Sequence, residues 1–399
     1  MRWAMLAILF LVRLAMGFEF QSIASTTGEL TDHFGLSYAQ IGTLIGLFLL
    51  PGIVISIPSG LLTRRFSDKH LLMGGALLMA LGALIIAGSS ELDGLYLGRI
   101  VAGVGATIFN LILTKMVTDW FFGKELVLAL SVMLTAWPIG IAVGLLLQAA
   151  IASSYGWSGV MIAAALVSLF ALVLTGLFYR PPAGAAVGSA GVLRYTLPGR
   201  EFLLMSLVGI AWGLFNAGLI VLVSFTPGLL QAYGRSPVQA QWLASLMMWT
   251  MLVSLPLGGQ LMGRLANVTP AITVTMLLAA LSTLSLVQGL APALTLIAFG
   301  LVAGLPAGAL MSLTAQAVTP DNRGPGLGIF YTWYYLGMTI APAIAGWLRD
   351  MTGNPAAPVM LVGAMMVGVA LLVNALRLSR RRWPPQAVLP ADLPPSSSG

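Results

Sequence analysis

The chain is a succession of long apolar stretches separated by short breaks that carry charged residues, glycine or proline. A helix needs about 20 mainly apolar residues to cross a bilayer. The pattern therefore predicts an all-α membrane protein with twelve transmembrane helices in two pseudo-symmetric six-helix bundles. The predicted helices are 3–24, 38–62, 71–89, 95–117, 126–151, 158–179, 202–230, 237–262, 271–289, 293–316, 326–348 and 357–378. The first has charges inside its apolar run and no small-residue cleavage site, so we expect it to be retained rather than cleaved as a signal peptide.

Composition narrows the class of protein. Of the 399 residues, 58% are hydrophobic and 8% are charged, whereas soluble domains carry roughly 25% charged residues. This deficit excludes a soluble enzyme, a nucleic-acid-binding module and a disordered scaffold. Cysteine is absent, His33 and His70 fall in predicted loops on opposite sides of the membrane, and no phosphate-binding G-x-x-x-x-G-K-S/T loop occurs. We therefore expect no enzymatic activity, no cofactor and no metal site.

The 19 lysine and arginine residues predict the orientation, because cytoplasmic loops collect these residues. With the N-terminus in the cytoplasm, fifteen of them lie on the cytoplasmic side or at its helix ends. Arg235 and Arg349 lie outside, and Arg13 and Arg99 lie within helices. The pattern predicts a multi-pass protein of the inner (plasma) membrane with both termini cytoplasmic. It also explains the net charge of +7 without a nucleic-acid partner.

The order of similar residues indicates a duplication. Residues 180–201, rich in Pro, Gly, Ala and Ser, are predicted to be a flexible cytoplasmic linker between bundles 1–179 and 202–378, and residues 379–399 a disordered tail. Duplicated six-helix halves are typical of secondary transporters, with the substrate site between them. Three groups recur in order about 200 residues apart: Val101-Ala102-Gly103 and Val302-Ala303-Gly304, Gly60 with Arg65 and Gly259 with Arg264, and Thr135 with Pro138 and Thr339 with Pro342.

Several motifs resemble those of the major facilitator superfamily, over essentially the whole chain. The stretch Arg99-Ile100-Val101-Ala102-Gly103-Val104-Gly105 is similar to the R-x-x-x-G-x-G motif of the fourth helix, and Trp137-Pro138-Ile139-Gly140 to a reduced Gly/Pro-rich motif of the fifth. After the second helix, Gly60 and Arg65 fit the loop motif G-x-x-x-D-R-x-G-R-R, but Arg64 replaces the acid, and Asp68 is the candidate substitute. The resemblance implies a bacterial 12-helix secondary transporter that works by alternating access.

Three charged residues are predicted to lie at depth, where a charge costs a few kcal/mol or more. Glu19 and Arg99 fall at similar depth in the outer half of the membrane. One interpretation is a Glu19–Arg99 pair that opens and closes with protonation, as the resemblance to proton-coupled members implies. The alternatives are a fixed structural pair and a Glu19 side chain that reaches the interface.

Arg13 is about ten residues from the inner end of its helix, roughly 15 Å deep and near the midplane. A guanidinium offers five fixed donors and stays charged, which suits a substrate carboxylate or another oxyanion. The alternative is an internal pair with Glu19, about 120° away around the helix.

Other residues are weaker candidates. Gln21, Asn110, Asn216, Tyr334 and Tyr335 are predicted to contact substrate, although asparagines also join helices and aromatic residues also form interfacial belts. Gly60, Arg65, Asp68, Gly103, Gly105, Pro138, Gly140 and Pro342 are the candidate motif and gating positions. The prolines are expected to bend their helices between the halves.

These features predict a monomeric secondary transporter in the lipid bilayer that moves a small organic anion with protons as the coupling ion. One alternative is efflux of drugs or other hydrophobic compounds. An alternative of another class is a non-transporting sensor or assembly scaffold, which has no reason to bury Arg13 and Glu19.

Overall fold

The computed structural model describes residues 2–55, 66–121, 123–180, 197–319 and 322–382, and this part of the chain is helical without β-strands. The expected motif positions Gly60 and Arg65 lie outside the described residues, as do most of the predicted linker and tail. The helices are α1 (Arg2–Ser25), α2 (Thr27–Phe34), α3 (Tyr38–Leu47), α4 (Pro51–Ile55), α6 (Asp68–Ala87), α7 (Leu92–Trp120), α8 (Gly123–Phe178), α9 (Gly199–Ala232), α10 (Pro237–Met262), α11 (Thr269–Val287), α12 (Pro292–Gly304), α13 (Ala307–Ser312), the 3-10 helix η1 (Leu313–Gln316), α14 (Arg323–Thr352) and α15 (Ala357–Arg382).

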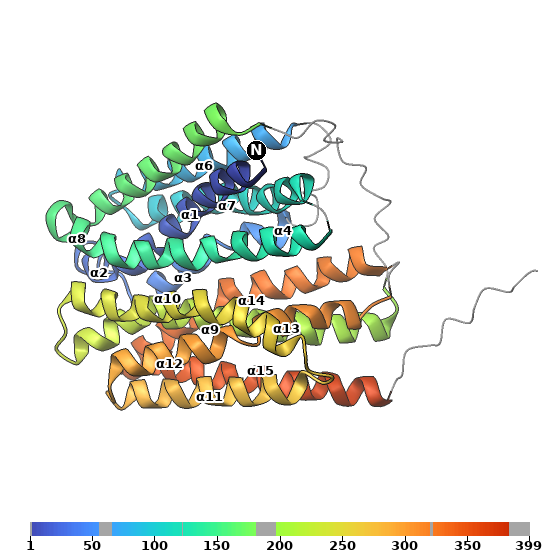
Figure 1. Cartoon of the computed structure of the whole chain (residues 1–399). Coiled ribbons are helices and arrows are strands. Elements are labelled where there is room, and N and C mark those ends of the chain that lie inside the picture. Colours follow the sequence, from blue (N-terminus) through green and yellow to red (C-terminus); the bar gives the residue numbers. More distant parts are fainter. Residues whose placement is uncertain (1, 56–65, 122, 181–196, 320–321, 383–399) are drawn as a thin grey trace, which may run out of the picture.

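The helices form two layers that lie one above the other in Figure 1. We call α1–α8 the N-terminal bundle and α9–α15 the C-terminal bundle. In the first, α1 packs mainly on α8 and α6 on α7; in the second, α9 packs on α14 and α15. The bundles meet where α3 packs on α14 and α10 packs on α8.

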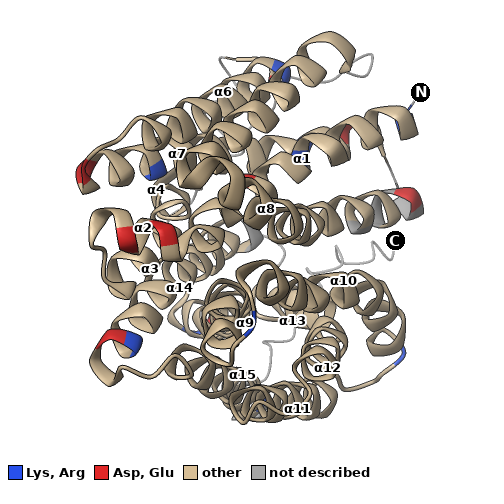
Figure 2. Ribbon diagram, turned by 90° about the vertical axis from the view of Figure 1, so that its left-hand side faces the viewer, with Lys and Arg blue, Asp and Glu red and all other residues tan. Residues whose placement is uncertain are grey.

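The outer surface is apolar and part of the interior is polar, the reverse of a soluble protein. On α8, Leu166, Phe170, Val173 and Leu177 recur at helical spacing and are 49–69% exposed. Ten helices of the described part are long and apolar enough to cross a membrane. Figure 2 shows few charged residues on a largely uncharged ribbon. The prediction of an all-α membrane protein is confirmed.

The predicted break between helices 126–151 and 158–179 is confirmed. The label α8 covers two helical segments, which meet at a kink at the non-helical Gly156. Gly156 has φ 69° and ψ −178°, a conformation that glycine adopts without steric cost. One residue therefore replaces the expected loop.

Two other predicted helices are interrupted. The stretch 38–62 divides into α3 and α4 around a turn after Leu47, and residues 56–65 lie outside the described part. The stretch 293–316 divides into α12, α13 and η1. Pro306 stands at the first of these breaks because its ring nitrogen cannot donate to the preceding turn.

The structure differs from the prediction at one additional helix and at two helix ends. The short amphipathic helix α2 was not expected, because eight residues are too few to show a membrane-spanning pattern. Helix α9 begins at Gly199, inside the predicted linker. Helix α15 continues to Arg382, so residues 379–382 are helical rather than part of a disordered tail.

Candidate functional site

Arg13 lies on α1 and faces the C-terminal bundle. Its side chain is buried, at 8% exposure, and interacts electrostatically with the hydroxyl groups of Tyr331, Tyr334 and Tyr335 of α14. Its Nε has no hydrogen-bond partner among the described residues, and no ion pair between described residues includes Arg13. The alternative of an internal Arg13–Glu19 pair is therefore not the arrangement observed.

Aromatic rings surround this guanidinium on the side of the C-terminal bundle. The ring centroids of Tyr334 and Tyr335 are 4.9 Å apart, edge to face, and Tyr331 lies 6.1 Å from Tyr334. Trp212 of α9 stacks on Tyr334 at 6.5 Å. Tyr335 also contacts Gly52 of α4, in the other bundle. The predicted ligands Arg13, Tyr334 and Tyr335 thus come together between the bundles.

Glu19 lies within the N-terminal bundle and is 1% exposed. Its Oε2 accepts a hydrogen bond of 2.5 Å from Ser168 Oγ, on the second segment of α8. Its Oε1 has no hydrogen-bond partner in the described part of the chain. The buried carboxyl group thus has one hydrogen-bond donor, and one of its oxygens is left without a partner among the described residues.

Arg99 of α7 is completely buried beside Glu19 but is not in an ion pair with it. Its Nε donates to the carbonyl oxygen of Leu44 at 2.9 Å, and a terminal nitrogen donates to that of Phe20 at 3.4 Å. The guanidinium also lies 4.6 Å from the ring centroid of Phe48. Glu19 and Arg99 still interact electrostatically. Arg99 therefore joins α1 to α3 while Glu19 binds α8.

The predicted amide ligands are dispersed. Gln21 is fully buried against Gly144 of α8, and its Nε2 donates to Ser25 Oγ at 3.4 Å. Asn216 of α9 donates to the carbonyl oxygen of Trp212 at 2.9 Å, within its own helix. Asn110 lies half-buried in α7. Gln21 and Asn216 are therefore engaged locally.

The motif glycines lie where helices approach closely. A Cβ atom on Gly103 would meet the carbonyl oxygen of Phe48, one on Gly105 that of Gly75, and one on Gly140 that of Leu14. Small residues permit such close contacts between membrane helices. Pro138 lies within α8 and Pro342 within α14. Asp68 pairs with Lys115, which also contacts Asp119 at 3.3 Å, so all three partners belong to the N-terminal bundle.

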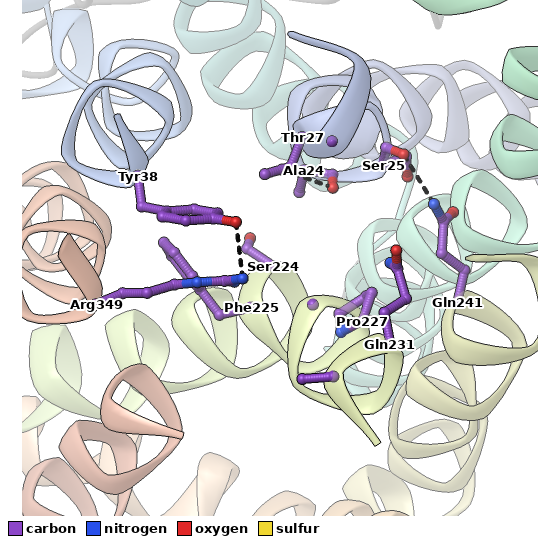
Figure 3. A pocket seen from close by; sticks show the side chains of 13 residues that line it. Ala24, Ser25, Thr27, Tyr38, Ser224, Phe225, Pro227, Gln231, Gln241 and Arg349 are labelled. Carbon is purple, nitrogen blue, oxygen red and sulfur yellow. Dashed lines mark hydrogen bonds between the residues drawn. The ribbon is translucent and has the colours of Figure 1, made fainter. Parts of the chain in front are cut away.

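The bundles are joined at the end of the molecule where α2 lies, which we call the α2 end. Asp350 of α14 accepts hydrogen bonds from the backbone nitrogens of Tyr38 (2.9 Å) and Ala39 (2.7 Å). Arg349 lies 3.5 Å from the ring centroid of Tyr38 and donates to its hydroxyl at 2.8 Å (Figure 3). Gln241 of α10 donates to the carbonyl oxygen of Ser25 at 2.8 Å. All four of these hydrogen bonds cross between the bundles.

Sequence analysis did not identify this contact. The sequence distinguishes Arg349 only as a basic residue on the outer side of the membrane and residue 38 only as the start of a predicted helix. The adjacent guanidinium and carboxylate of Arg349 and Asp350, near the end of α14, are the sequence feature that could have indicated a contact here. Their partner is 311 residues away in the sequence.

A cavity of about 260 Å³ lies beside the Tyr38–Arg349 contact (Figure 3). Its lining comes from both bundles. The polar residues that face it include Ser25, Tyr38, Ser224, Gln231, Gln241 and Arg349.

Close packing of α3 on α14 yields a test. A Cβ atom on Gly42 would overlap the carbonyl group of Pro342, and overpacking costs about 1–3 kcal/mol. We expect Gly42→Val to separate the bundles at the α2 end and to raise the labelling rate of a Ser25→Cys reporter about tenfold. A membrane-impermeant maleimide measures this rate, and no other cysteine interferes.

The matched control for this experiment is Gly74→Val, because a Cβ on Gly74 meets nothing within 4 Å. Equal labelling of the reporter in the Gly42→Val and Gly74→Val proteins would show that the α3–α14 contact does not keep this end closed.

Two bundles of membrane-length helices, with a buried arginine between them and two further charges buried within the N-terminal bundle, are the arrangement expected of a multi-pass secondary transporter. The profile of the Major Facilitator Superfamily matches residues 9–225 and 202–396, and the chain belongs to this superfamily. Its members are transporters rather than enzymes, which confirms the expected class.

Individual relatives agree with this assignment. The chain is 29% identical over 403 residues to the 3-(3-hydroxy-phenyl)propionate transporter of Escherichia coli (strain K12), with 94% of each chain covered. It is 26% identical to monocarboxylate transporter 13 of Bos taurus, covering 78% of this chain and 75% of that one. The crystal structure of a D-xylose-proton symporter has the same fold, with a TM-score of 0.76, 16% identity, and coverage of 93% of this chain and 97% of that one.

Proposed function

We propose that the protein moves a small organic anion, together with protons, across the inner membrane. The observation that carries this proposal is Arg13, a buried guanidinium that faces the opposite bundle with its Nε unpartnered among the described residues. A buried charge is retained at a cost unless a partner compensates it. A substrate carboxylate, bound at two of its donors, is the partner that fits a guanidinium best.

The tyrosines favour an aromatic carboxylate among the organic anions. Tyr331, Tyr334 and Tyr335 offer ring faces and hydroxyl groups beside Arg13, and Trp212 adds a further ring. An aromatic substrate would stack on these rings while its carboxylate reaches the guanidinium. The relative that is 29% identical is a 3-(3-hydroxy-phenyl)propionate transporter, an aromatic acid carrier by its name.

Glu19 is the proposed proton-binding group. Its carboxyl is buried near the charge of Arg99, and the proton affinity of a carboxyl group depends on the distance to such a cation. A movement of α1 relative to α7 would therefore load or release a proton. Arg99 acts as a fixed charge in this scheme, because the backbones of α1 and α3 hold it.

Alternating access would use the two halves as moving parts. The hydrogen bonds at Tyr38, Ala39 and Gln241 hold the α2 end together, so breaking them would admit solute from that side. The distribution of lysine and arginine favours a cytoplasmic location for the opposite end and for both termini. In this scheme residues 1–179 and 202–378 rock relative to one another, and one monomer is sufficient.

Reconstituted proteoliposomes test the proposal. Uptake of radiolabelled benzoate and 3-phenylpropionate is measured with the lumen alkaline relative to the bath, and again after an ionophore has collapsed the gradient. We expect accumulation above equilibrium only while the gradient persists. Uptake no greater than in protein-free liposomes, or equal uptake with and without the gradient, would contradict the proposed function.

A further inference from the structure

An apolar groove lies on the surface of the N-terminal bundle, toward the end of the molecule opposite α2. Its volume is about 320 Å³, and it is lined by Trp3, Leu6, Ala7 and Phe10 of α1 and by Val132 of α8. The four residues of α1 recur at helical spacing and share one face of the helix. Figure 1 shows α1 between the two segments of α8, and the groove lies where α1 meets the first of these segments.

The lining of this groove favours an apolar occupant. Four of the five side chains are hydrocarbon, and Trp3 adds a single indole N–H group. Trp3 and Val132 are 43% and 37% exposed, and Leu128, one turn before Val132, is 54% exposed. The groove therefore continues the apolar outer surface of the bundle. A hydrated anion would lose its hydrogen bonds to water here without gaining others, whereas a hydrocarbon chain would lose none.

The direction and length of the groove fit a chain that runs along the helix. From Trp3 to Phe10 the axis of α1 rises roughly 10 Å, while half of the hydrocarbon core of a bilayer is about 15 Å thick. Trp3 is the second residue of α1 and its ring contacts Phe121 edge to face at 5.0 Å. Tryptophan is enriched at the membrane surface. The groove thus extends from that surface through most of one leaflet, as a lipid acyl chain does.

The start of the groove carries charged groups that suit a phosphate. The terminal nitrogens of Arg2 lie 2.8 and 2.9 Å from the carboxylate oxygens of Glu125. The Arg2 side chain is 49% exposed, and an exposed ion pair of this kind contributes little, so the guanidinium can accept a further partner. Helices α1 and α8 both begin at this end, and their dipoles favour a negative charge there.

We propose that this groove is a binding site for a membrane phospholipid. One acyl chain lies against Ala7 and Phe10, and the phosphate lies at Arg2 and the start of α1. The lipid belongs to the leaflet at the end opposite α2, and its second chain remains in the bilayer. This inference does not depend on the transported solute, because it involves neither Arg13 nor Glu19.

Photocrosslinking of the full-length protein in dodecyl maltoside micelles tests the site. The probe is dioleoylphosphatidylglycerol with a diazirine in one acyl chain, and mass spectrometry measures the yield on the peptide that contains residues 3–10 as the probe is titrated. Ala7→Trp fills the groove and is expected to weaken binding at least about tenfold. Ala4→Trp is the matched control, since Ala4 is an exposed residue of the same helix outside the groove lining, and is expected to leave binding unchanged.

Competition with unlabelled lipids tests the phosphate. Dioleoylphosphatidylglycerol and dioleoylglycerol have the same chains, and we expect the phospholipid to compete at least about fivefold more strongly, because charge-assisted hydrogen bonds are the stronger ones. Arg2→Gln leaves the groove intact and is expected to remove most of this preference, whereas Arg235→Gln, an exposed arginine at the α2 end, preserves it. Equal binding in the Ala7→Trp and Ala4→Trp proteins, or an unchanged preference in the Arg2→Gln protein, would overturn the inference.

Discussion

Replacing Arg13 with glutamine is expected to weaken binding of an aromatic carboxylate by about tenfold to a hundredfold, since hydrogen bonds to charged groups contribute about 1.5–3 kcal/mol. Glutamine retains a polar side chain but loses the charge and the paired donors. The tyrosines of α14 remain in place, so the rings continue to offer a stacking surface. Calorimetric titration of the purified protein with 3-phenylpropionate measures the dissociation constant.

Two further variants serve as controls for this measurement. Arg13→Lys keeps the positive charge and is expected to recover part of the affinity, because an ammonium group lacks the planar fork of the guanidinium. Arg235→Gln removes an exposed arginine between α9 and α10 and is expected to bind as the unsubstituted protein does. If the Arg13→Gln protein binds 3-phenylpropionate with full affinity, Arg13 does not bind the substrate carboxylate.

The second large effect is expected for Glu19→Gln. This substitution conserves the shape of the side chain and an oxygen that accepts the hydrogen bond from Ser168, but it removes the titratable proton. Accumulation driven by a pH gradient should fall to the level reached without a gradient. Exchange of labelled for unlabelled substrate at equal pH should continue, because it requires no net proton movement.

Glu125→Gln is the matched control, because Glu125 forms an exposed pair with Arg2 at the start of α1. It is expected to keep gradient-driven accumulation. If the Glu19→Gln protein accumulates substrate as well as the Glu125→Gln protein does, Glu19 is not the proton-binding group.

The sequence predicts the helices well where length and apolarity decide the structure. The stretch 237–262 coincides with α10, and 3–24 differs from α1 by one residue at each end. The predicted break at 152–157 contains the kink at Gly156, although the sequence does not show that one non-helical residue is sufficient there. The break after α12 was not predicted, because Pro306 permits a break but does not require one in a membrane helix.

Because the chain has few charged residues, the buried ones could be predicted from the sequence, but their partners could not. Arg13, Glu19 and Arg99 are the ionisable residues that fall inside apolar runs, and all three are buried. The expected contact between Glu19 and Arg99 depends on how α1 and α7 rotate about their axes, and no local pattern encodes that rotation. Each side chain instead has nearer partners, Ser168 for Glu19 and the backbone of Leu44 for Arg99. The sequence does not predict the Tyr38–Arg349 contact for a similar reason, since it joins two ordinary helix ends across the bundle interface.

The short connection at Gly156 between the two segments of α8 has a mechanical consequence. Its first segment touches α1 at Gly17 through Gly140, and its second segment binds Glu19 through Ser168. Because a single non-helical residue connects these segments, α1 contacts two helical segments that are directly linked in the chain. Arg13 and Glu19, six residues and roughly 9 Å apart along α1, would be displaced together. Binding of the solute and binding of the proton would then be coupled directly through the movement of α1. No longer-range conformational change would be required to link the two sites.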